Sequence, residues 1–329
     1  MHNVIITGAD GFVGSETAKY FLSRGCDVIA VGRKASPERL QPSENLKYIS
    51  CDVSNIDQMR ELLKSASSDS YDAYIHFAWN GSAGNARTDY ELQLKNVRDT
   101  VENLKFAKSI GCKKFVCAGS IMEYEVEAVV HSQGSLPGMA YIYGMCKLMA
   151  HCICKSVAAN IGIDLLWPMI TNAYGPGEMS PRFLNTTLRK IMNNEPLQFT
   201  SAVQNYDFVY ITDAARAFYL ITENGKPFHE YIIGSSQAKP LREFIIEIKD
   251  TLAPEADLLF GDVPFTGTNM PLETFDTSKT EHDCGFKAQV KFSDGVKNTY
   301  DWLRNLHKGG DRSLKIKPSS EFISGGLAA

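Results

Sequence analysis

Short apolar runs alternate with amphipathic segments along the first half of the chain. The apolar runs occupy residues 3–8, 26–32, 46–52, 71–78, 113–120 and 162–169. Runs of this kind are typical of strands that are buried on both faces of a parallel sheet. Between them, the spacing of apolar residues predicts helices over residues 12–24, 56–68, 89–110 and 141–160. Because strands and helices alternate, we predict an α/β fold with a doubly wound parallel sheet and right-handed crossovers.

The regular alternation ends after Pro168, where the stretch YGPGEMSPRF at 174–183 predicts turns and a loop. Further elements are expected near residues 183–193, 207–223, 230–234, 240–252 and 293–306. The predicted parts of the chain are a main domain over 1–168, a segment near 205–234 that returns to it, and a smaller C-terminal lobe formed by 169–204 and 235–308. The tail 309–329 lacks hydrophobic periodicity, so we expect it to be a flexible end.

The composition is that of an ordinary globular protein. Of the 329 residues, 44% are hydrophobic and 22% are charged, and the net charge of −4 argues against a nucleic-acid partner. No apolar run is long enough to span a membrane, and the N-terminus does not resemble a signal peptide. Cys152 and Cys154 lack a second pair at metal-site spacing, so we expect no metal. Reduced thiols in a cytoplasmic protein are the expected state of the cysteines.

Three glycines lie between the first predicted strand and the first predicted helix, in the stretch TGADGFVG. Gly8, Gly11 and Gly14 permit a tight turn, a close approach of the backbone to a pyrophosphate, and free N–H groups at a helix N-terminus. The strand before them and the helix after them provide the context that a dinucleotide site requires. We therefore predict a Rossmann domain that binds a dinucleotide through these glycines and through Phe12 and Val13 of the same turn.

The end of the second predicted strand indicates which dinucleotide binds. An acidic side chain there would accept hydrogen bonds from the ribose 2′-OH, but the chain has Arg33 and Lys34. Two cations favour a 2′-phosphate, so NADP is the predicted cofactor. NAD is the alternative, with Arg33 stacked on the adenine or exposed to solvent. Asp52 and Val53, at the end of the third strand, are the predicted contacts of the adenine.

A tyrosine and a lysine are spaced four residues apart in the helix predicted at 141–160. Tyr143 and Lys147 share one helix face, so a phenol and an ammonium can reach the same small volume. The spacing by itself is compatible with a packed aromatic ring beside a solvated lysine, and equally with an acid and the cation that tunes it.

A series of motifs occurs in a fixed order along the chain. They are TGxxGxxG at 7–14, HFAW at 76–79, KNV at 95–97, AGSIMEY at 118–124, the pair Tyr143 and Lys147, NAYGPG at 172–177 and DFVYITDAARA at 207–217. From about residue 3 to residue 306 the chain resembles the extended short-chain dehydrogenase/reductases of the NAD-dependent epimerase/dehydratase type, which act on nucleotide sugars. The resemblance implies that the C-terminal lobe binds the substrate.

The resemblance also implies a role for each motif residue. Ser120 takes the position of the family's catalytic Ser/Thr and Tyr143 that of the proton donor. Lys147 takes the position of the cation that stabilises the phenolate and holds the nicotinamide ribose. A free phenol has a pKa of about 10, so at neutral pH it exchanges protons poorly unless a nearby cation stabilises the phenolate. Further cofactor contacts implied by the resemblance are Phe77, Ala78, Trp79, Met169 and Asn96, the last in a helix that supports the site.

Departures from the family pattern bear on the reaction and on the substrate. Dehydratases of the family carry an Asp-Glu pair after the catalytic Ser/Thr, but this chain has Ile121 and Met122, which cannot transfer protons. Dehydration is therefore not expected. Tyr206 stands where relatives place an arginine for the diphosphate, and 266–273 lacks a second one, so Tyr206 either stacks on a base or packs. The expected substrate contacts are Ser120, Met122, Asn172, Arg182 and Tyr206, with Arg189 as a further candidate for the diphosphate.

The nearest resemblance, in HFAWNG, SxxEY and the aromatic residue before DFVY, is to CDP- or dTDP-linked 4-keto-6-deoxyhexose reductases. It implies NADPH-dependent reduction at C4 of a nucleoside-diphospho-keto-sugar. Two alternatives stay open, namely an epimerase that keeps its cofactor bound and a non-catalytic cofactor-binding regulator. The helices expected at 89–110 and 141–160 resemble the pair through which the family dimerises, which implies a homodimer.

Overall fold

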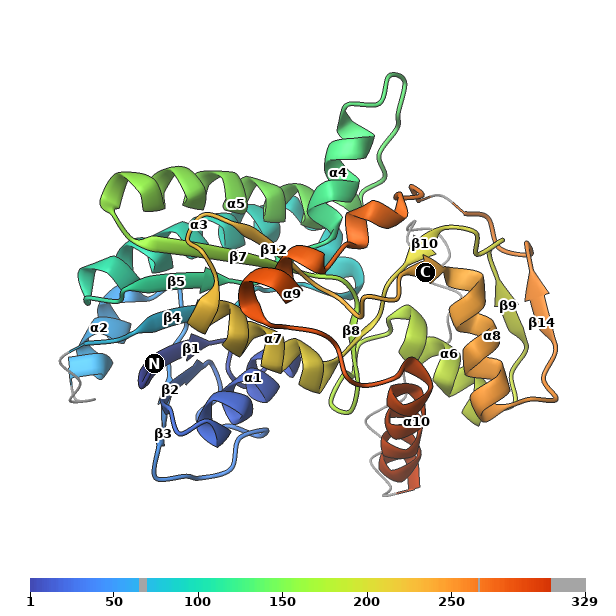
Figure 1. The fold of residues 1–329 in the computed structure, drawn as a ribbon, viewed down its shortest axis with the longest axis horizontal. Coiled ribbons are helices and arrows are strands. Elements are labelled where there is room, and N and C mark those ends of the chain that lie inside the picture. Colours follow the sequence, from blue (N-terminus) through green and yellow to red (C-terminus); the bar gives the residue numbers. More distant parts are fainter. Residues whose placement is uncertain (65–69, 266, 309–329) are drawn as a thin grey trace.

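A parallel β-sheet forms the centre of the molecule (Figure 1). The computed structural model describes residues 1–64, 70–265 and 267–308. Within these residues the sheet has eight strands in the order β12-β7-β5-β4-β1-β2-β3, with β6 beside β7, and every pair is parallel. The strands are β1 (Asn3–Thr7), β2 (Asp27–Gly32), β3 (Leu46–Ser50), β4 (Ala73–His76), β5 (Lys114–Cys117), β6 (Gly119–Ser120), β7 (Asp164–Ile170) and β12 (Glu230–Ile233).

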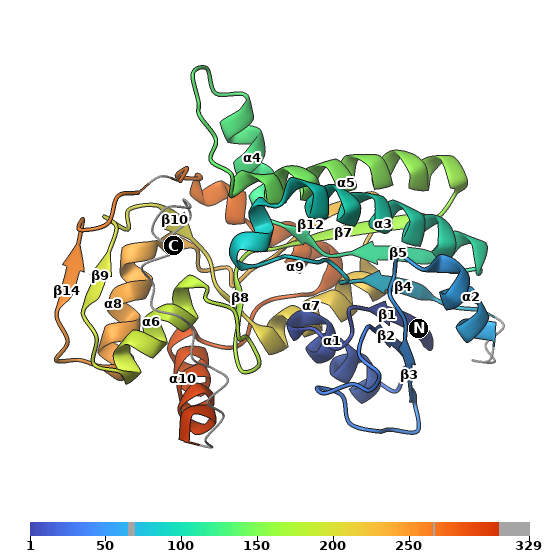
Figure 2. The ribbon, with the colours of Figure 1, turned by 180° about the vertical axis from the view of Figure 1, so that it is seen from behind.

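Helices cover both faces of this sheet. One face carries α2 (Ile56–Lys64), α3 (Tyr90–Ser109) and α5 (Tyr141–Ile161), and the other carries α1 (Phe12–Ser23) and α7 (Ile211–Asn224) (Figure 2). Successive residues of β1 alternate between the two cores, since Ile5 packs on the α3 side and Val4 and Ile6 on the α1 side. All three are fully buried, as expected for a strand covered on both faces. The predicted doubly wound α/β fold is confirmed.

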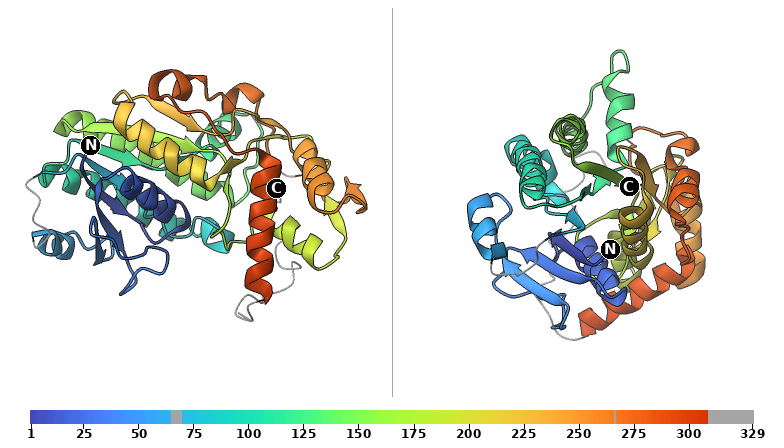
Figure 3. Two further views of the ribbon diagram at one scale, coloured as in Figure 1. Left: turned by 60° about the horizontal axis from the view of Figure 1, so that its bottom comes forward. Right: turned by 60° about the vertical axis from the view of Figure 1, so that its left-hand side comes forward.

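A third core lies in the C-terminal part of the chain. Its helices are α6 (Phe183–Met192), α8 (Leu241–Leu252) and α10 (Phe292–Lys308), and α10 packs against the other two (Figure 3). Leu188, Phe208, Phe244 and Val296 are buried between them. Three small sheets complete this part: β8 (Ala173–Tyr174) with β11 (Val209–Tyr210), β9 (Leu197–Phe199) with β14 (Leu258–Phe260), and β10 (Asn205–Tyr206) with β13 (Lys239–Pro240).

Several elements differ from those expected from the hydrophobic pattern. The run 113–120 forms two strands, β5 and β6, which pair in the same register with successive parts of β7 and are separated at Ala118. Helix α4 (Met122–Val130) and the loop after it project from the body of the molecule (Figure 1). The hydrophobic pattern also did not predict the helix α9 (Ser278–Cys284) or the short 3-10 helices η1 (Gly84–Thr88) and η2 (Leu272–Phe275). The expected flexible tail, 309–329, lies outside the described residues.

Three further findings concern the described residues together. Over the described ranges, no helix combines the length and the apolar character needed to cross a lipid bilayer. All eight cysteines fall within these ranges, and none forms a disulfide. The same ranges contain no group of three histidine, cysteine or acidic side chains placed to hold a metal ion.

The carboxylate of Asp72 fastens the N-terminal strand to its neighbours. Its Oδ2 accepts hydrogen bonds from the backbone N–H groups of His2 (2.7 Å) and Asn3 (3.3 Å), and its Oδ1 lies 2.6 Å from Lys113 Nζ. Partial burial by itself would raise the pKa of the Asp72 carboxyl, but these donors outweigh it and lower the pKa to about 2. A carboxyl in an unfolded chain has a pKa of about 3.9, so the charged form stabilises the folded state above that pH.

We expect Asp72→Asn to lower the free energy of unfolding at pH 7 by about 1 kcal/mol, because the ion pair with Lys113 reaches solvent and is screened. The difference from the wild type should shrink as the pH falls from about 4 towards 2, where the native carboxylate takes up its proton. Urea unfolding at several pH values measures this. Asp27→Asn, which removes an exposed carboxylate from the adjacent strand, is the control. A difference that does not change with pH would contradict the assignment.

Candidate active site

The glycine turn between β1 and α1 is packed so closely that side chains are excluded. Gly8 has a φ of +66°, and a Cβ on it would lie 2.8 Å from the backbone nitrogen of Ala78 and 2.9 Å from the carbonyl carbon of Phe77. A Cβ on Gly14 would lie 2.2 Å from the Gly8 carbonyl oxygen. Gly11 is the N-cap of α1 and offers no side chain to its first N–H groups. The first turn of α1 therefore presents backbone donors that suit a pyrophosphate.

The two cations that follow β2 lie in different environments. Lys34 Nζ is 3.2 Å from Asp10 Oδ2 and also pairs with Glu38, so its charge is compensated. Arg33 is exposed and has no ion pair within the part of the chain that the structure describes. A few residues further on, Arg39 Nη1 donates to the carbonyl oxygen of Gly177, 2.7 Å away. The segment after β2 is thereby connected to the loop that follows β8.

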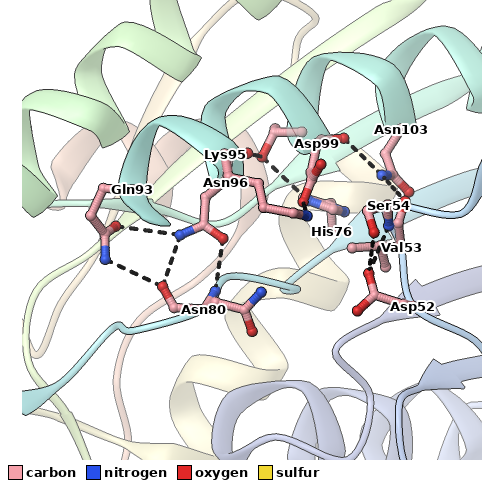
Figure 4. A network of polar contacts seen from close by, with 11 residues as sticks. Asp52, Val53, Ser54, His76, Asn80, Gln93, Lys95, Asn96, Asp99 and Asn103 are labelled. Carbon is pink, nitrogen blue, oxygen red and sulfur yellow. Dashed lines mark hydrogen bonds and ion pairs between the residues drawn. The ribbon is translucent and has the colours of Figure 1, made fainter. Parts of the chain in front are cut away.

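The predicted adenine contacts, Asp52 and Val53, are held by their own neighbours. Asp52 Oδ1 accepts from the backbone N–H (2.9 Å) and the hydroxyl (2.7 Å) of Ser54, and these bonds lower the pKa of the Asp52 carboxyl (Figure 4). The carbonyl oxygen of Val53 accepts from Asn103 Nδ2 of α3, 2.9 Å away. The loop after β3 is thus fixed by a turn of its own and by α3.

Asn96 holds the loop that follows β4. Its Oδ1 accepts from the backbone N–H of Asn80 (2.9 Å), and its Nδ2 donates to the carbonyl oxygen of the same residue (2.8 Å) (Figure 4). One turn earlier, Gln93 accepts from Trp79 Nε1 (2.7 Å) and donates to the carbonyl oxygens of Gly81 and Ala86. Both amide side chains are buried, so the loop has a single well-defined arrangement.

Tyr143 and Lys147 lie at the start of α5, beside Trp79. Lys147 Nζ donates to the carbonyl oxygen of Ala118 (2.9 Å) and lies 3.7 Å from the centroid of the Trp79 ring. The Trp79 and Tyr143 rings meet edge to face, with centroids 6.1 Å apart. Lys147 is only 5% exposed, and its partners are a carbonyl dipole and an aromatic face. Lys147 is therefore a buried cation beside Tyr143 and not the solvated lysine that the helix spacing also allowed.

A buried carboxylate lies behind Ser120. Glu123 is 2% exposed and accepts from the backbone N–H of Ser120 (2.9 Å), from Trp167 Nε1 (3.1 Å) and from His151 Nδ1 (2.9 Å). His151 stacks on Trp167, with centroids 4.7 Å apart and planes 3° apart. Neither Glu123 nor His151 was predicted from the sequence to belong to the site. His151 lies four residues after Lys147, on the face shared by Tyr143 and Lys147, and this spacing was the available signal.

Met169 lies on the outer side of this network. Its backbone pairs with Gly119 of β6 and with Ile232 of β12. Its side chain helps to line a cavity of about 110 Å³, together with Glu123, Tyr124, Glu127, Leu148, His151, Cys152, Lys155 and Glu230. The role of Met169 as a cofactor contact stays a prediction.

The residues predicted to bind the substrate come from both parts of the molecule. Ser120 Oγ accepts from the backbone N–H of Met122 (3.3 Å), which leaves its own O–H able to donate. Asn172 Nδ2 donates to the carbonyl oxygen of Asp207 (2.9 Å) and so has a structural role. Arg182 Nη2 donates to the carbonyl oxygen of Ser82 (3.3 Å) and thereby connects α6 with the loop after β4.

Tyr206 and Arg189 occupy partly buried positions of the C-terminal part. The Tyr206 ring packs against Phe208, with centroids 5.1 Å apart, and burial and the nearby Glu125 raise the pKa of the Tyr206 hydroxyl to about 12. Nε and Nη2 of Arg189 are buried without a hydrogen-bond partner in the described residues. A guanidinium with buried donors that are unused suits an anion such as a diphosphate.

Arg87, in η1, is a further charged residue of this region that was not predicted from the sequence. Its Cζ lies 4.6 Å from the centroid of the Tyr143 ring, and its Nη2 contacts Met122 Sδ. Burial lowers the pKa of the Arg87 guanidinium. No local pattern marks Arg87, because only the fold brings it to Tyr143.

The family model of the NAD dependent epimerase/dehydratase family matches residues 4–234. The chain therefore belongs to this family of enzymes, and the prediction made from its motifs is confirmed. The fit of the glycine turn to a pyrophosphate agrees with a nicotinamide dinucleotide as the family's cofactor.

Among its relatives, the chain is 23% identical over 309 residues to dTDP-4-dehydro-6-deoxyglucose reductase of Escherichia coli, covering 90% of this chain and 95% of the relative. It is also 23% identical over 340 residues to a trifunctional UDP-glucose 4,6-dehydratase/UDP-4-keto-6-deoxy-D-glucose 3,5-epimerase/UDP-4-keto-L-rhamnose-reductase of Arabidopsis thaliana, covering 98% of this chain and 50% of the relative. The chain thus spans about half the length of that relative.

A solved structure with the same fold is UDP-glucuronic acid 4-epimerase from Bacillus cereus in complex with NAD. Its TM-score is 0.74 at 21% identity, and the match covers 94% of this chain and 99% of that chain. At this level of identity the similarity shows the fold, while the reaction has to be argued from the residues of the site.

Proposed function

We propose that the chain is an NADPH-dependent oxidoreductase that reduces the 4-keto group of a nucleoside-diphospho-4-keto-6-deoxyhexose, in the cytoplasm. The observation that carries the proposal is the pair of side chains after Ser120. Ile121 and Met122 are both buried and apolar, so they offer no group for the proton transfers of dehydration. Tyr143 and Lys147, in contrast, lie together beside the motif that contains Ser120.

In the proposed reaction the bound cofactor supplies hydride to the carbonyl carbon of the sugar. Tyr143 gives its hydroxyl proton to the carbonyl oxygen, which becomes a hydroxyl group and leaves a phenolate on the enzyme. Ser120 donates a hydrogen bond to the same oxygen and orients it. Lys147 Nζ, 6.0 Å from the centroid of the Tyr143 ring, contributes positive charge near the phenolate.

We propose that the substrate lies between the main sheet and the lobe formed by 169–204 and 235–308. Arg189 is suited to bind its diphosphate, because its buried Nε and Nη2 donors have no hydrogen-bond acceptor in the described residues. Arg182, at the N-terminus of α6, is a second candidate cation. Asn172 supports this region through its bond to Asp207.

An epimerase with tightly held NAD or NADP is the second candidate function, and the contact between Arg39 and Gly177 favours it. That hydrogen bond connects the segment after β2 with the loop after β8, on either side of the glycine turn. A cofactor beneath such a connection would exchange slowly. Slow exchange suits an enzyme that returns the hydride to its substrate, whereas a reductase must release its oxidised cofactor in every turnover.

We also propose a homodimer formed through α3 and α5, which pack side by side on one face of the sheet. Leu94 of α3 and Met149 and Ile153 of α5 are large apolar side chains that are about 40% exposed. Burying them against a second copy would complete a four-helix arrangement. Light scattering at micromolar concentration is expected to give twice the chain mass, and a monomeric mass would contradict the proposal.

The reaction is tested by mixing the enzyme, NADPH and an NDP-4-keto-6-deoxyhexose and following both the reduced nicotinamide and the sugar. We expect NADPH to be consumed in a 1:1 ratio with the 4-hydroxy sugar. Tyr143→Phe should fold normally and bind the cofactor but lose about 10²–10⁴ in rate, the usual contribution of one positioned proton donor. Tyr20→Phe, remote from the site, is the control. An inverted stereocentre with unchanged NADPH would instead establish the epimerase.

The choice of NADP is tested at Arg33, the cation after β2 without an ion pair in the described residues. Arg33→Ala should weaken NADPH binding by about tenfold or more and NADH binding much less, because only NADPH carries the 2′-phosphate that loses its partner. Lys34→Ala should have a smaller effect, since Asp10 and Glu38 already compensate Lys34. Dissociation constants measured by fluorescence titration decide this. Equal losses for the two cofactors would mean that Arg33 does not read the phosphate.

A further inference from the structure

Arg87 is partly buried beside Tyr143. No ion pair joins it to an acidic side chain among the residues that the structure describes, and its Nε is buried with no hydrogen-bond partner. A guanidinium in such a place is costly unless something compensates its charge. Its contacts are the face of the Tyr143 ring, with Cζ 4.6 Å from the centroid, and the sulfur of Met122.

Glu125, an acid that acts on Arg87, has hydrogen-bond partners of its own. Glu125 of α4 accepts from the Tyr141 hydroxyl at 3.3 Å, and that hydroxyl lies 3.1 Å from Thr268 Oγ1. Burial raises the pKa of the Glu125 carboxyl, which disfavours its charged form. Arg182, from the C-terminal lobe, adds a second positive charge that acts on Arg87. Glu125 thus favours the charge of Arg87 and Arg182 opposes it, but neither forms an ion pair with it among the residues that the structure describes.

Tyr143 is bordered by cations on two elements. Lys147 lies on its own helix, with Nζ 6.0 Å from the ring centroid, and Arg87 lies closer, on η1. The other titratable groups that act on Arg87 are Glu125 on α4, Arg182 at the start of α6 and Tyr206 on β10. Of these, Arg87 is the charge that lies against the face of the phenol ring.

We propose that Arg87 is a positioning residue for Tyr143, whose guanidinium holds the ring and compensates the negative charge that its oxygen acquires during proton transfer. As the carbonyl carbon of the substrate takes up hydride from the reduced nicotinamide, the Tyr143 proton passes to the carbonyl oxygen. The products are a hydroxyl group, an oxidised nicotinamide and a phenolate. Arg87 lacks a carboxylate partner in the resting site because its counter-charge forms only in this step.

This inference rests on the proposed role of Tyr143, but one of its tests needs no substrate. The ultraviolet phenolate band of Tyr143 is obtained by subtracting the spectrum of Tyr143→Phe from that of the wild type over a range of pH. The same subtraction is made for Arg87→Met, using Arg87→Met combined with Tyr143→Phe. We expect the band to appear about one pH unit or more higher without Arg87, since a cation within about 4–6 Å favours the charged form of an acid. Arg87→Lys should restore most of the difference.

Rates provide the second test, if turnover is found. Arg87→Met should lower kcat about tenfold or more in the wild type, with a change of less than about threefold in KM. In the Tyr143→Phe background the same substitution should have little further effect, because the group through which Arg87 acts is absent. Arg24→Met is the matched control, since Arg24 lies 5.7 Å from the centroid of the Tyr219 ring, away from the site. It should change neither the phenolate band nor the rate.

Three results would overturn the proposal: a phenolate band that does not move, an equal loss of rate in both backgrounds, or a loss confined to KM. A loss confined to KM would make Arg87 a substrate ligand. If every nucleotide sugar is inert with the wild type but the band still shifts, the proposed reaction fails while the pairing of Arg87 with Tyr143 stands. Arg87→Gln replaces Arg87→Met if circular dichroism shows that the methionine variant is misfolded.

Discussion

The ammonium of Lys147, buried at the junction of α5 and the sheet, is the interaction around which the candidate site is built. A buried charge without an acidic partner has to be satisfied by dipoles and aromatic faces. The carbonyl oxygen of Ala118 and the ring of Trp79 provide these, and both therefore have to lie close to α5. Ala118 precedes Ser120 by two residues, and Trp79 borders Tyr143. Placing this one ammonium thus also places the proposed catalytic hydroxyls and the loop after β4.

Two kinds of buried charge meet in this region, and they are compensated in different ways. Glu123 receives hydrogen bonds from Ser120, Trp167 and His151, so it acts as a fixed anchor behind Ser120. Arg87 has no comparable set of partners in the described residues. A fully satisfied network rigidifies a site, whereas an unsatisfied charge marks a place where a counter-charge arrives later. The contrast separates the supporting part of the site from the part that we propose acts during the reaction.

The backbone around the glycine turn explains why the cofactor side of the site could be recognised from the sequence. Gly8 requires a positive φ, and Gly14 has no space for a Cβ against the Gly8 carbonyl. Such requirements depend on residues close together in the chain, so they leave a local pattern. The alternating apolar runs predicted the sheet for the same reason, because each strand is buried on both faces. The helix spacing of Tyr143 and Lys147 is likewise a local property of α5.

The sequence by itself therefore determined the α/β class, the glycine turn, the family and the shared face of Tyr143 and Lys147. What depended on the tertiary structure was every contact between segments that are distant in the chain. Arg87 meets Tyr143, Arg39 meets Gly177, and Glu123 meets His151 only after the helices pack. Arg33 and Lys34 are adjacent in sequence, but Asp10 of the glycine turn pairs with Lys34 and leaves their environments different. The spacing of residues along the chain does not predict these contacts, because the partners come together only when the cores pack.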